Sequence, residues 1–164
     1  MLQDMNPADV PGAWREATLK LFDAGTRKVL VCDREMPYPD GRLIVSTSDT
    51  RGIITHCNTS FVEMSGYTRE ELIGAPHCIL RHPDMPTRVY RQLWEEARLG
   101  RIWHGYVKNL RKDGAFYWVY ATVIANVRQG RVAGYTSVRR KPSRRKVEEA
   151  ERQYRQWLAE ERVR

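Results

Sequence analysis

Residues 102–140 read IWHGYVKNLRKDGAFYWVYATVIANVRQGRVAGYTSVRR, and this stretch decides the fold. It contains three runs rich in aromatic and β-branched side chains, which favour strands. Two short segments, RKDGA and RQGR, separate the runs, and such glycine-containing segments are typical of tight hairpin turns. The stretch therefore predicts three consecutive antiparallel strands.

Two further strands and several helices are expected upstream. Within residues 43–58, LIVSTSD and GIITHCN are short β-branched runs separated by TRG, which indicates a hairpin. Thr68 and Glu71 then form a capping box at the start of a short helix. A longer helix follows, with Thr87 able to cap its start and Gly100 its end. Its apolar residues recur at helical spacing: Val89, Leu93, Trp94 and Ala97.

The order of elements is thus two strands, three or four short helices and three strands. Five strands in one antiparallel sheet, with the helices packed on one face, make an α+β architecture. Such a sheet leaves a pocket between its concave face and the helices. We therefore predict an α+β domain over residues 43–140.

Two more helices are expected outside this domain. Residues 11–25 place Trp14, Ala17 and Leu21 at roughly helical spacing. Residues 143–164 continue an a/d heptad pattern for about two heptads, which is too short for stability without a partner or the domain surface.

The prolines and the Asp-Gly of residues 36–41 interrupt the chain, and we place a domain boundary there. The expected units are an N-terminal helical extension (1–42), a central domain (43–140) and a C-terminal signalling or linker helix (141–164).

Composition indicates a cytoplasmic protein with one hydrophobic core. The chain has 164 residues, 41% of them hydrophobic, and three widely spaced cysteines that favour reduced thiols. Neither a signal peptide nor a membrane-spanning run is present in the sequence. No Walker loop, paired zinc motif or catalytic triad pattern appears, so an enzyme is not expected.

The net charge of +8 is concentrated in the central domain. Residues 43–140 carry fourteen basic and eight acidic side chains, a balance of +6. Such a domain could attract nucleic acid or hold an anionic small ligand. The basic run RRKPSRRK (139–146) is short and lies at a linker, so a solvated linker is favoured over a nucleic-acid contact.

The segment ILRHPDMP (79–86) holds three ionisable residues at a corner stiffened by two prolines. Arg81, His82 and Asp84 could form a salt-bridged turn among themselves. They could instead bind a ligand, because a guanidinium offers paired donors to anionic oxygens. The segment alone leaves both interpretations open.

These motifs together resemble the PAS family. The resemblance covers residues 43–140 and rests on ITHCN, SGYTREELIG, RHPDMP, IWHGYVKNLRKDGAFYWV and GYTSVRR. Within this family, the sequence is most similar to the FAD-binding PAS sensors of bacterial aerotaxis receptors. The resemblance implies a non-catalytic redox or oxygen sensor in signal transduction that holds FAD non-covalently. It implies cofactor-binding roles for Arg81, His82, Asp84, Trp94, Asn109, Asn58 and Trp103.

Several of these residues also have ordinary structural explanations. Trp94 lies on the inward stripe of its helix, where tryptophan is usually core. Asp84 could bond its own backbone in a turn, and Asn58 could cap the following helix. Asn109 lies within a strand, where asparagine is disfavoured, so its amide needs a partner that a flavin would supply.

Other cofactors are less consistent with the sequence. Blue-light-sensing PAS relatives bond flavin through a cysteine three residues after a glycine, and here His77 stands at that spacing, with Cys78 one residue later. A one-residue slip on a short helix turns a side chain by about 100°, so a photochemical adduct is not expected. Haem is the alternative cofactor, with His77, His82 and His104 as candidate ligands.

A cofactor-free module for dimerisation or partner docking is the alternative function. In either case the terminal helices are the expected contact with a homodimer or a signalling partner. The N-terminal extension has no counterpart in the resemblance.

Overall fold

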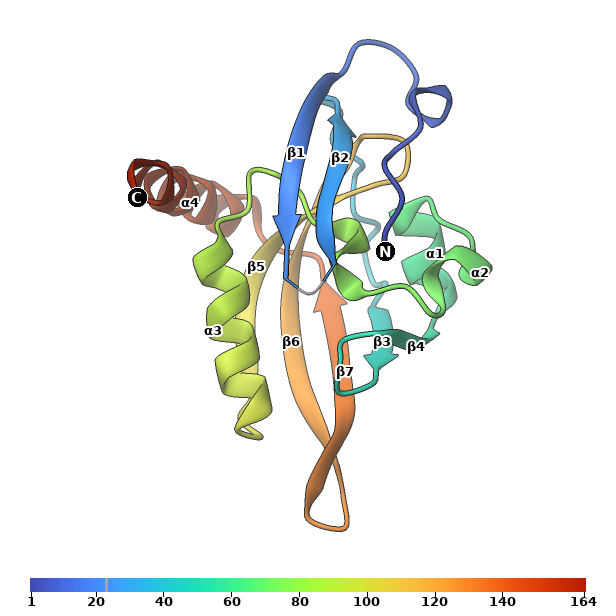
Figure 1. Cartoon of the computed structure of the whole chain (residues 1–164), viewed down its shortest axis with the longest axis vertical. Coiled ribbons are helices and arrows are strands. Elements are labelled where there is room, and N and C mark those ends of the chain that lie inside the picture. Colours follow the sequence, from blue (N-terminus) through green and yellow to red (C-terminus); the bar gives the residue numbers. More distant parts are fainter. Residues whose placement is uncertain (23) are drawn as a thin grey trace.

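The computed structural model describes residues 1–22 and 24–164, and its centre is a five-stranded antiparallel sheet (Figure 1). The strands lie in the order β4-β3-β7-β6-β5. Their bounds are Ile44–Ser48 (β3), Ile54–Cys57 (β4), Trp103–Leu110 (β5), Phe116–Arg128 (β6) and Arg131–Arg140 (β7). The predicted α+β sheet is confirmed.

The last strand, β7, occupies the centre of the sheet because it pairs with both β3 and β6. Its hairpin with β6 turns at Gln129 and Gly130, whose φ angles are 51° and 73°. Two consecutive positive φ angles are typical of the type I′ turn, whose twist matches that of the flanking strands. The hairpin predicted at RQGR is confirmed.

Four short helices connect β4 to β5. They are α1 (Thr59–Ser65), α2 (Arg69–Leu72), η2 (His77–Leu80) and α3 (Thr87–Arg98). The predicted capping box is present, since the hydroxyl of Thr68 accepts from the amide of Glu71 and the Glu71 carboxylate accepts from the amide of Thr68. α3 packs against β5 and β6, and α1 packs against β3.

The predicted cap of the long helix is wrong. Thr87 is the first residue of α3 rather than its cap, and Pro86 precedes it without a side-chain hydrogen bond. The amides of Thr87 and Arg88 instead donate to the carboxylate of Glu161, at 3.1 and 3.0 Å. A negative charge at this position also complements the helix dipole.

The predicted N-terminal helix is also wrong. After a short turn η1 (Pro7–Asp9), the chain forms a hairpin of β1 (Arg15–Leu21) and β2 (Gly25–Val31). Leu19 and Leu21 are buried while Lys20 is exposed, which is the alternation of a strand. Trp14, the first residue of the supposed helical stripe, is 41% exposed. The hairpin has its own small core, which includes Val29 and reaches Leu110.

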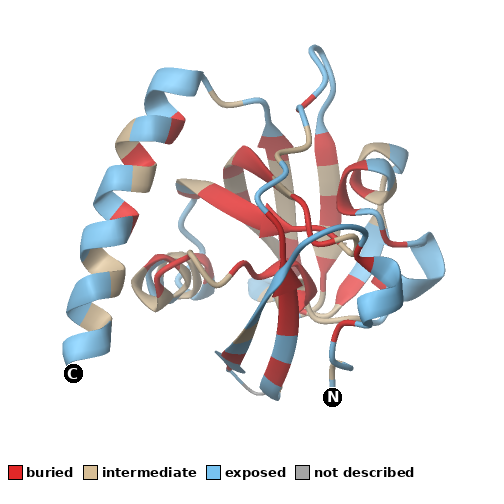
Figure 2. Ribbon diagram, turned by 90° about the horizontal axis from the view of Figure 1, so that it is seen from above, coloured by how far each residue is buried: buried red, intermediate tan, exposed pale blue. Residues whose placement is uncertain are grey.

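The predicted C-terminal helix is confirmed as α4 (Arg144–Val163), and the surface that stabilises it lies on the same chain. Val147, Ala150 and Tyr154 are buried along one side (Figure 2). The Tyr154 hydroxyl donates to the carbonyl of Tyr106 in β5 at 2.6 Å. No helix within residues 1–22 and 24–164 is long and apolar enough to cross a membrane. The boundaries at residues 42 and 140 stay predictions.

Candidate cofactor pocket

A cavity of about 1420 Å³ lies between one face of the sheet and the helices. Binding pockets for small molecules usually measure about 300 to 1,000 Å³. This cavity therefore has room for more than one ring system. Its walls come from the sheet, η2, α3, the β3–β4 turn and the N-terminal segment.

The floor of the cavity is made by alternate residues of β5, β6 and β7. Side chains at every second position of a strand share one face. The floor is largely apolar and includes the small side chain of Ala121 between Val119 and Val123. On the neighbouring strand, Gly105 lies opposite Ala121. Such a floor can accept a flat aromatic ligand.

Trp103 and Trp94 lie at the border of this floor. The Trp103 ring covers Gly105, where an added Cβ would come within 2.3 Å of the indole. Trp94, on α3, lines the cavity and packs edge-on against Tyr135 of β7, with ring centroids 5.2 Å apart. Trp94 is thus both packed against the domain and exposed to the cavity, whereas Trp103 is a core residue beside it.

The inner end of the cavity is polar because Arg139 and Asn109 line it. Arg139 is only 5% exposed, and its guanidinium donates to the hydroxyl of Ser46 at 2.5 Å and stacks on the Phe61 ring. Its Nε has no partner among the described residues. Burial lowers the pKa of Arg139 to about 10, so the group remains a cation at neutral pH.

Tyr117 adds a second polar group beside Arg139. It lies opposite Asn109 in the β5–β6 register, and burial raises its pKa to about 12. By distance and angle its hydroxyl has no hydrogen-bond partner within residues 1–22 and 24–164, although the Asn109 side chain lies close enough to oppose the rise in its pKa; Tyr117 itself does not line the cavity. Buried polar groups without partners are uncommon and each needs an explanation. Arg139 lines the cavity, so a ligand with hydrogen-bonding edges would supply the partner that its Nε lacks.

Arg81 faces the cavity from the corner between η2 and α3. Its Nη2 donates to the Thr87 hydroxyl at 3.1 Å, and its guanidinium lies 4.5 Å from the centre of the Tyr90 ring. Its Nε has no partner among the described residues. Arg81 makes no ion pair with Asp84, so that pair does not hold the turn; within the segment, Nδ1 of His82 lies 3.7 Å from the Asp84 carboxylate.

His82 and Asp84 point away from the cavity. The His82 ring is 1% exposed, packs against Phe116, and accepts from the amide of Asp84 through Nδ1. The Asp84 carboxylate pairs with Lys108 of β5 at 2.9 Å and with Arg15 of β1 at 3.1 Å. In this structure the two residues therefore fix the loop between β5 and the N-terminal hairpin.

Asn58 also lies outside the cavity. Its Oδ1 accepts from the amides of Phe61 and Val45, and its Nδ2 donates to the carbonyl of Leu43. It therefore caps α1 and connects that helix to β3, as its helix-capping explanation anticipated. Of the seven candidate residues, Arg81, Trp94 and Asn109 line the cavity.

We expect acid to destabilise the protein through His82. Burial lowers its pKa from 6.5 to about 3, so the folded state keeps the ring neutral while the unfolded chain takes up a proton below 6.5. Stability from this group is complete above pH 6.5 and falls as the pH decreases, by about 1.4 kcal/mol per pH unit. Urea unfolding between about pH 6.5 and 5, where carboxylates titrate little, measures the slope.

The variant H82N cannot titrate but keeps an acceptor near Nδ1. Its free energy of unfolding should therefore depend on pH less steeply than that of the wild type, by the uptake of one proton. His77, whose pKa burial also lowers to about 3, supplies the remaining dependence. An unchanged slope in H82N would show that His82 is protonated in the folded protein.

The balance of buried charge distinguishes the cavity from the rest of the protein. The described residues bury five cationic side chains: Arg27, Arg81, Lys108, Arg111 and Arg139. Lys108 and Arg111 lie outside the cavity and pair with Asp84 and Asp113. The other three line the cavity, and no described carboxylate lies within 4.0 Å of them.

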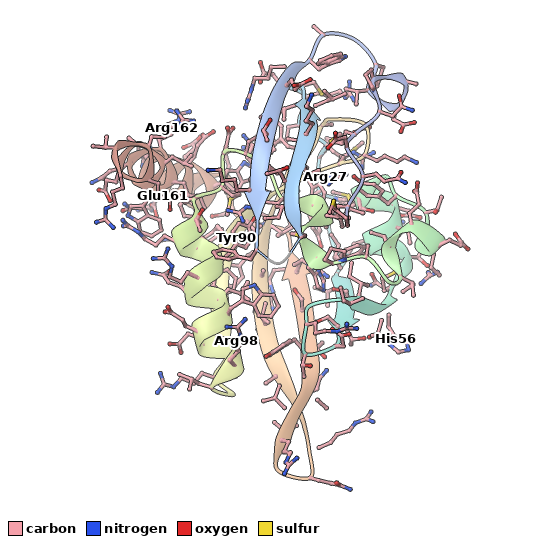
Figure 3. All side chains as sticks on the ribbon, in the orientation of Figure 1. Arg27, His56, Tyr90, Arg98, Glu161 and Arg162 are labelled. Carbon is pink, nitrogen blue, oxygen red and sulfur yellow. The ribbon has the colours of Figure 1, made fainter. Side chains whose placement is uncertain are left out.

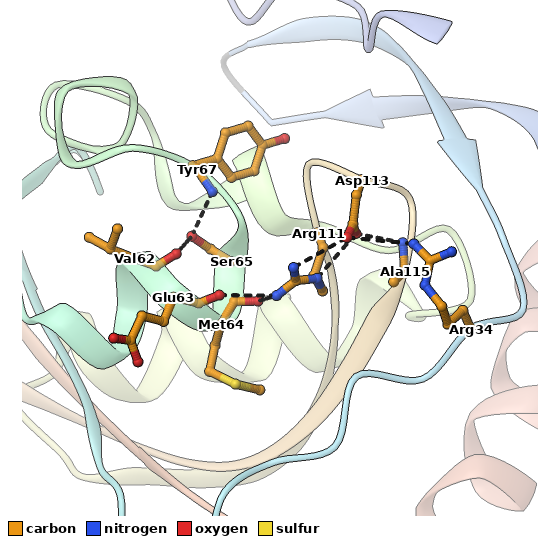
Figure 4. Close-up of polar contacts among 9 residues, drawn as sticks. All are labelled: Arg34, Val62, Glu63, Met64, Ser65, Tyr67, Arg111, Asp113 and Ala115. Carbon is orange, nitrogen blue, oxygen red and sulfur yellow. Dashed lines mark hydrogen bonds and ion pairs between the residues drawn. The ribbon is translucent and has the colours of Figure 1, made fainter. Parts of the chain in front are cut away.

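Arg111 shows how this chain pairs a buried arginine when the role is structural. Its guanidinium donates twice to Asp113, at 3.1 and 3.2 Å, and also to the carbonyls of Glu63 and Met64 (Figure 4). A buried cation without such a partner is unfavourable. The cavity is therefore suited to an anionic ligand with a flat ring.

Sequence reasoning missed Arg27 and Arg139 as candidates. Arg139 stood within a segment quoted for the resemblance, and the two-residue alternation along its own strand could have placed it on the inner face with Tyr135 and Ser137. For Arg27 no such signal exists, because it lies two residues beyond the helix expected over residues 11–25 and outside the predicted central domain.

Comparison with known proteins places the fold in a family. The family model described as the PAS fold matches residues 54–139. Over 109 residues the chain is 44% identical to the aerotaxis receptor of Escherichia coli K12, a match covering 66% of this chain and 22% of the receptor. Over 75 residues it is 35% identical to the biofilm dispersion protein BdlA of Pseudomonas aeruginosa, covering 45% and 18%. The chain spans about a fifth of the length of these relatives.

Solved structures agree on the fold. The light-state structure of the blue-light photoreceptor Aureochrome1 LOV has a TM-score of 0.58 and 18% identity, and the match covers 73% of this chain and 91% of that one. The LOV domain of the blue-light activated histidine kinase of Erythrobacter litoralis EL346 has a TM-score of 0.56 and 17% identity, covering 60% and 94%. The five-stranded sheet with its helices is the architecture that they share.

Proposed function

Since the chain belongs to the PAS fold family, we propose that it is a cytoplasmic, non-catalytic sensor whose cavity binds FAD non-covalently and reports redox state. The observation that carries the proposal is a set of three buried arginines without carboxylate partners. They surround a cavity whose floor is largely apolar and includes the small side chain of Ala121. The identity to the aerotaxis receptor supports the same function.

The residues of the cavity divide into an apolar and a polar set. Ala121 and its valine neighbours would contact the flat face of the ring, with Trp94 at the border. Arg139 and Asn109 would hydrogen-bond the polar edge of the ring, and Arg81 would hold a phosphate. A bound flavin would supply a ring that accepts and releases electrons and changes charge as it does so.

The hydrogen bonds at the start of α3 support a route from the cavity to the C-terminal helix. Arg81 donates to the hydroxyl of Thr87, and the amide of Thr87 donates to Glu161 of α4. A shift of Arg81 would therefore disturb the contact that connects α4 to α3. We propose that α4, released or re-oriented in this way, reports to a second copy of the chain or to a signalling partner.

Replacing Glu161 by alanine is expected to loosen α4. The carboxylate caps the first two amides of α3, and loss of a cap typically costs about 1 kcal/mol. Hydrogen exchange of residues 155–163 should accelerate, and reduction of the flavin should no longer alter it. E160A is the matched control, because Glu160 pairs with Arg88 on the surface, where ion pairs contribute little. Equal effects of the two variants would contradict this route.

The visible absorption spectrum of the purified protein, before and after dithionite, tests the proposed function. We expect the two visible bands of an oxidised flavin, and their loss on reduction. The released cofactor should have the mass of FAD. A Soret band would indicate haem, for which His77 is the candidate ligand that lines the cavity. A protein without visible bands that retains no flavin after incubation with FAD and removal of the unbound FAD would support a cofactor-free interaction module.

A further inference from the structure

Arg27 lies on the N-terminal hairpin, outside the residues that match the PAS family model, yet its side chain lines the same cavity. It projects from β2 beside the N-terminal segment (Figure 3). Nε donates to the carbonyl of Gln3 at 2.8 Å, Nη1 to the carbonyl of Ile79 at 2.8 Å, and Nη2 to the hydroxyl of Tyr67 at 3.2 Å. One side chain thus joins three segments around the mouth of the cavity.

All three acceptors of Arg27 are neutral, although its side chain is only 4% exposed. A guanidinium has five N–H donors, so two remain after these three hydrogen bonds. The carboxylates at the rim are those of Asp4, Asp9, Glu71 and Glu95. Asp4 accepts from the amide of Lys28, and Glu71 pairs with Lys112. None of the described carboxylates lies within 4.0 Å of Arg27.

Arg27 and Arg81 lie on the same wall of the cavity. Arg27 bonds the carbonyl of Ile79, and Arg81 follows two residues later with its amide bonded to the carbonyl of Cys78. Burial raises the pKa of the Cys78 thiol, and the nearby positive charges of Arg27 and Arg81 oppose that rise. Arg81 also keeps an Nε without a partner among the described residues. This wall therefore carries two positive charges and free donors.

Beyond Arg27 the wall continues into the N-terminal segment. Residues 1–6 line the cavity and are attached to β2, since the amide of Met5 donates to the carbonyl of Lys28 at 3.0 Å. The cavity thus extends from the apolar floor of the sheet, past the two arginines, to a rim that the hairpin and this segment provide. A ligand that fills it has a ring at one end, charge in the middle and a further group at the other end.

We propose that Arg27 and Arg81 together form a diphosphate subsite, so that the hairpin makes the cavity selective for a flavin dinucleotide over a flavin mononucleotide. This inference rests on the proposed function and adds the residue that recognises the second phosphate. A single cation suffices for one phosphate, whereas two cations on one wall match two linked phosphates. The adenosine would then extend toward residues 1–6.

Titration of the apoprotein with FAD, FMN and riboflavin tests this subsite, with flavin fluorescence as the measurement. The wild type should bind FAD more tightly than FMN by about 10-fold or more. In R27Q the affinity for FAD should fall by about 10- to 100-fold, while that for riboflavin, which has no phosphate, is unchanged. R27K keeps the charge without the paired donors, so its affinity for FAD should lie between those of the wild type and R27Q.

Y67F is the matched control, because it removes a neutral partner of Arg27 and leaves the cation in place. It should keep the preference of the wild type for FAD over FMN. An equal loss of affinity for all three flavins in R27Q, or equal binding of FAD and FMN by the wild type, would overturn the subsite while leaving a flavin sensor intact. If the wild type binds none of the three, the proposed function itself fails.

Discussion

Replacing Arg139 by methionine is expected to weaken flavin binding strongly and to leave the apoprotein as stable as the wild type, or more so. The guanidinium is a buried cation whose described partner is the neutral hydroxyl of Ser46. Replacing buried charges by apolar side chains of similar volume is often neutral or stabilising, by up to about 4 kcal/mol. The same change removes a charged donor from the inner end of the cavity, so the affinity for flavin should fall by about 100-fold.

Arg111 provides the matched control for this prediction. It is buried to a similar degree but pairs with Asp113, outside the cavity. R111M should therefore destabilise the apoprotein by about 1 to 3 kcal/mol, because it leaves the carbonyls of Glu63 and Met64 without their donor and leaves Asp113 only its pair with Arg34 at 3.5 Å. Urea unfolding of both apoproteins, with flavin titration, compares them. A loss of stability in R139M as large as that in R111M would show that Arg139 is structural rather than held for a ligand.

Replacing Gly134 by alanine is expected to disrupt the sheet where β3 joins β7. An added Cβ would lie 2.2 Å from the backbone carbonyl oxygen of Ser48, and backbone cannot move aside as a flexible side chain can. Overpacking usually costs about 1 to 3 kcal/mol, and we expect the upper end of this range or more. Ser48 also lines the cavity, so flavin affinity should fall with stability.

Gly130, in the β6–β7 turn, separates this steric effect from backbone strain. It has a φ of 73° and no atom within 4 Å of an added Cβ. G130A should therefore cost only about 1 kcal/mol, from the left-handed conformation, and should leave flavin affinity unchanged. Thermal unfolding and flavin titration of the two variants test the difference. Equal losses would mean that β3 and β7 adjust to the additional methyl group.

The sheet and its central hairpin could be predicted because their signals are local. The β-branched and aromatic runs of residues 102–140 favour strands, and Gln129 with Gly130 supplies the two positive φ angles of the turn. The heptad pattern of residues 143–164 likewise predicted α4, although the sequence did not reveal that its partner is the domain itself. Each of these features depends on neighbours within a few residues.

The N-terminal region shows where local signals mislead. Trp14, Ala17 and Leu21 have helical spacing, but the burial of Leu19 and Leu21 against the second core makes this region a strand. An amphipathic stretch takes the conformation that buries its apolar side chains against available surface. The surface includes Leu110, far along the chain, so the outcome depends on the tertiary fold.

The corner RHPDMP shows the same division within the candidate site. The sequence by itself determined that three ionisable residues would gather at a stiff turn within a PAS fold. Only the tertiary structure decided that Arg81 faces the cavity while His82 and Asp84 face Phe116, Lys108 and Arg15. The reason is physical: the free energy of a buried charge depends on which opposite charges lie within a few ångströms. In this chain the opposite charges that pair with Asp84 come from segments distant in sequence. Around the cavity, no described carboxylate pairs with the buried arginines.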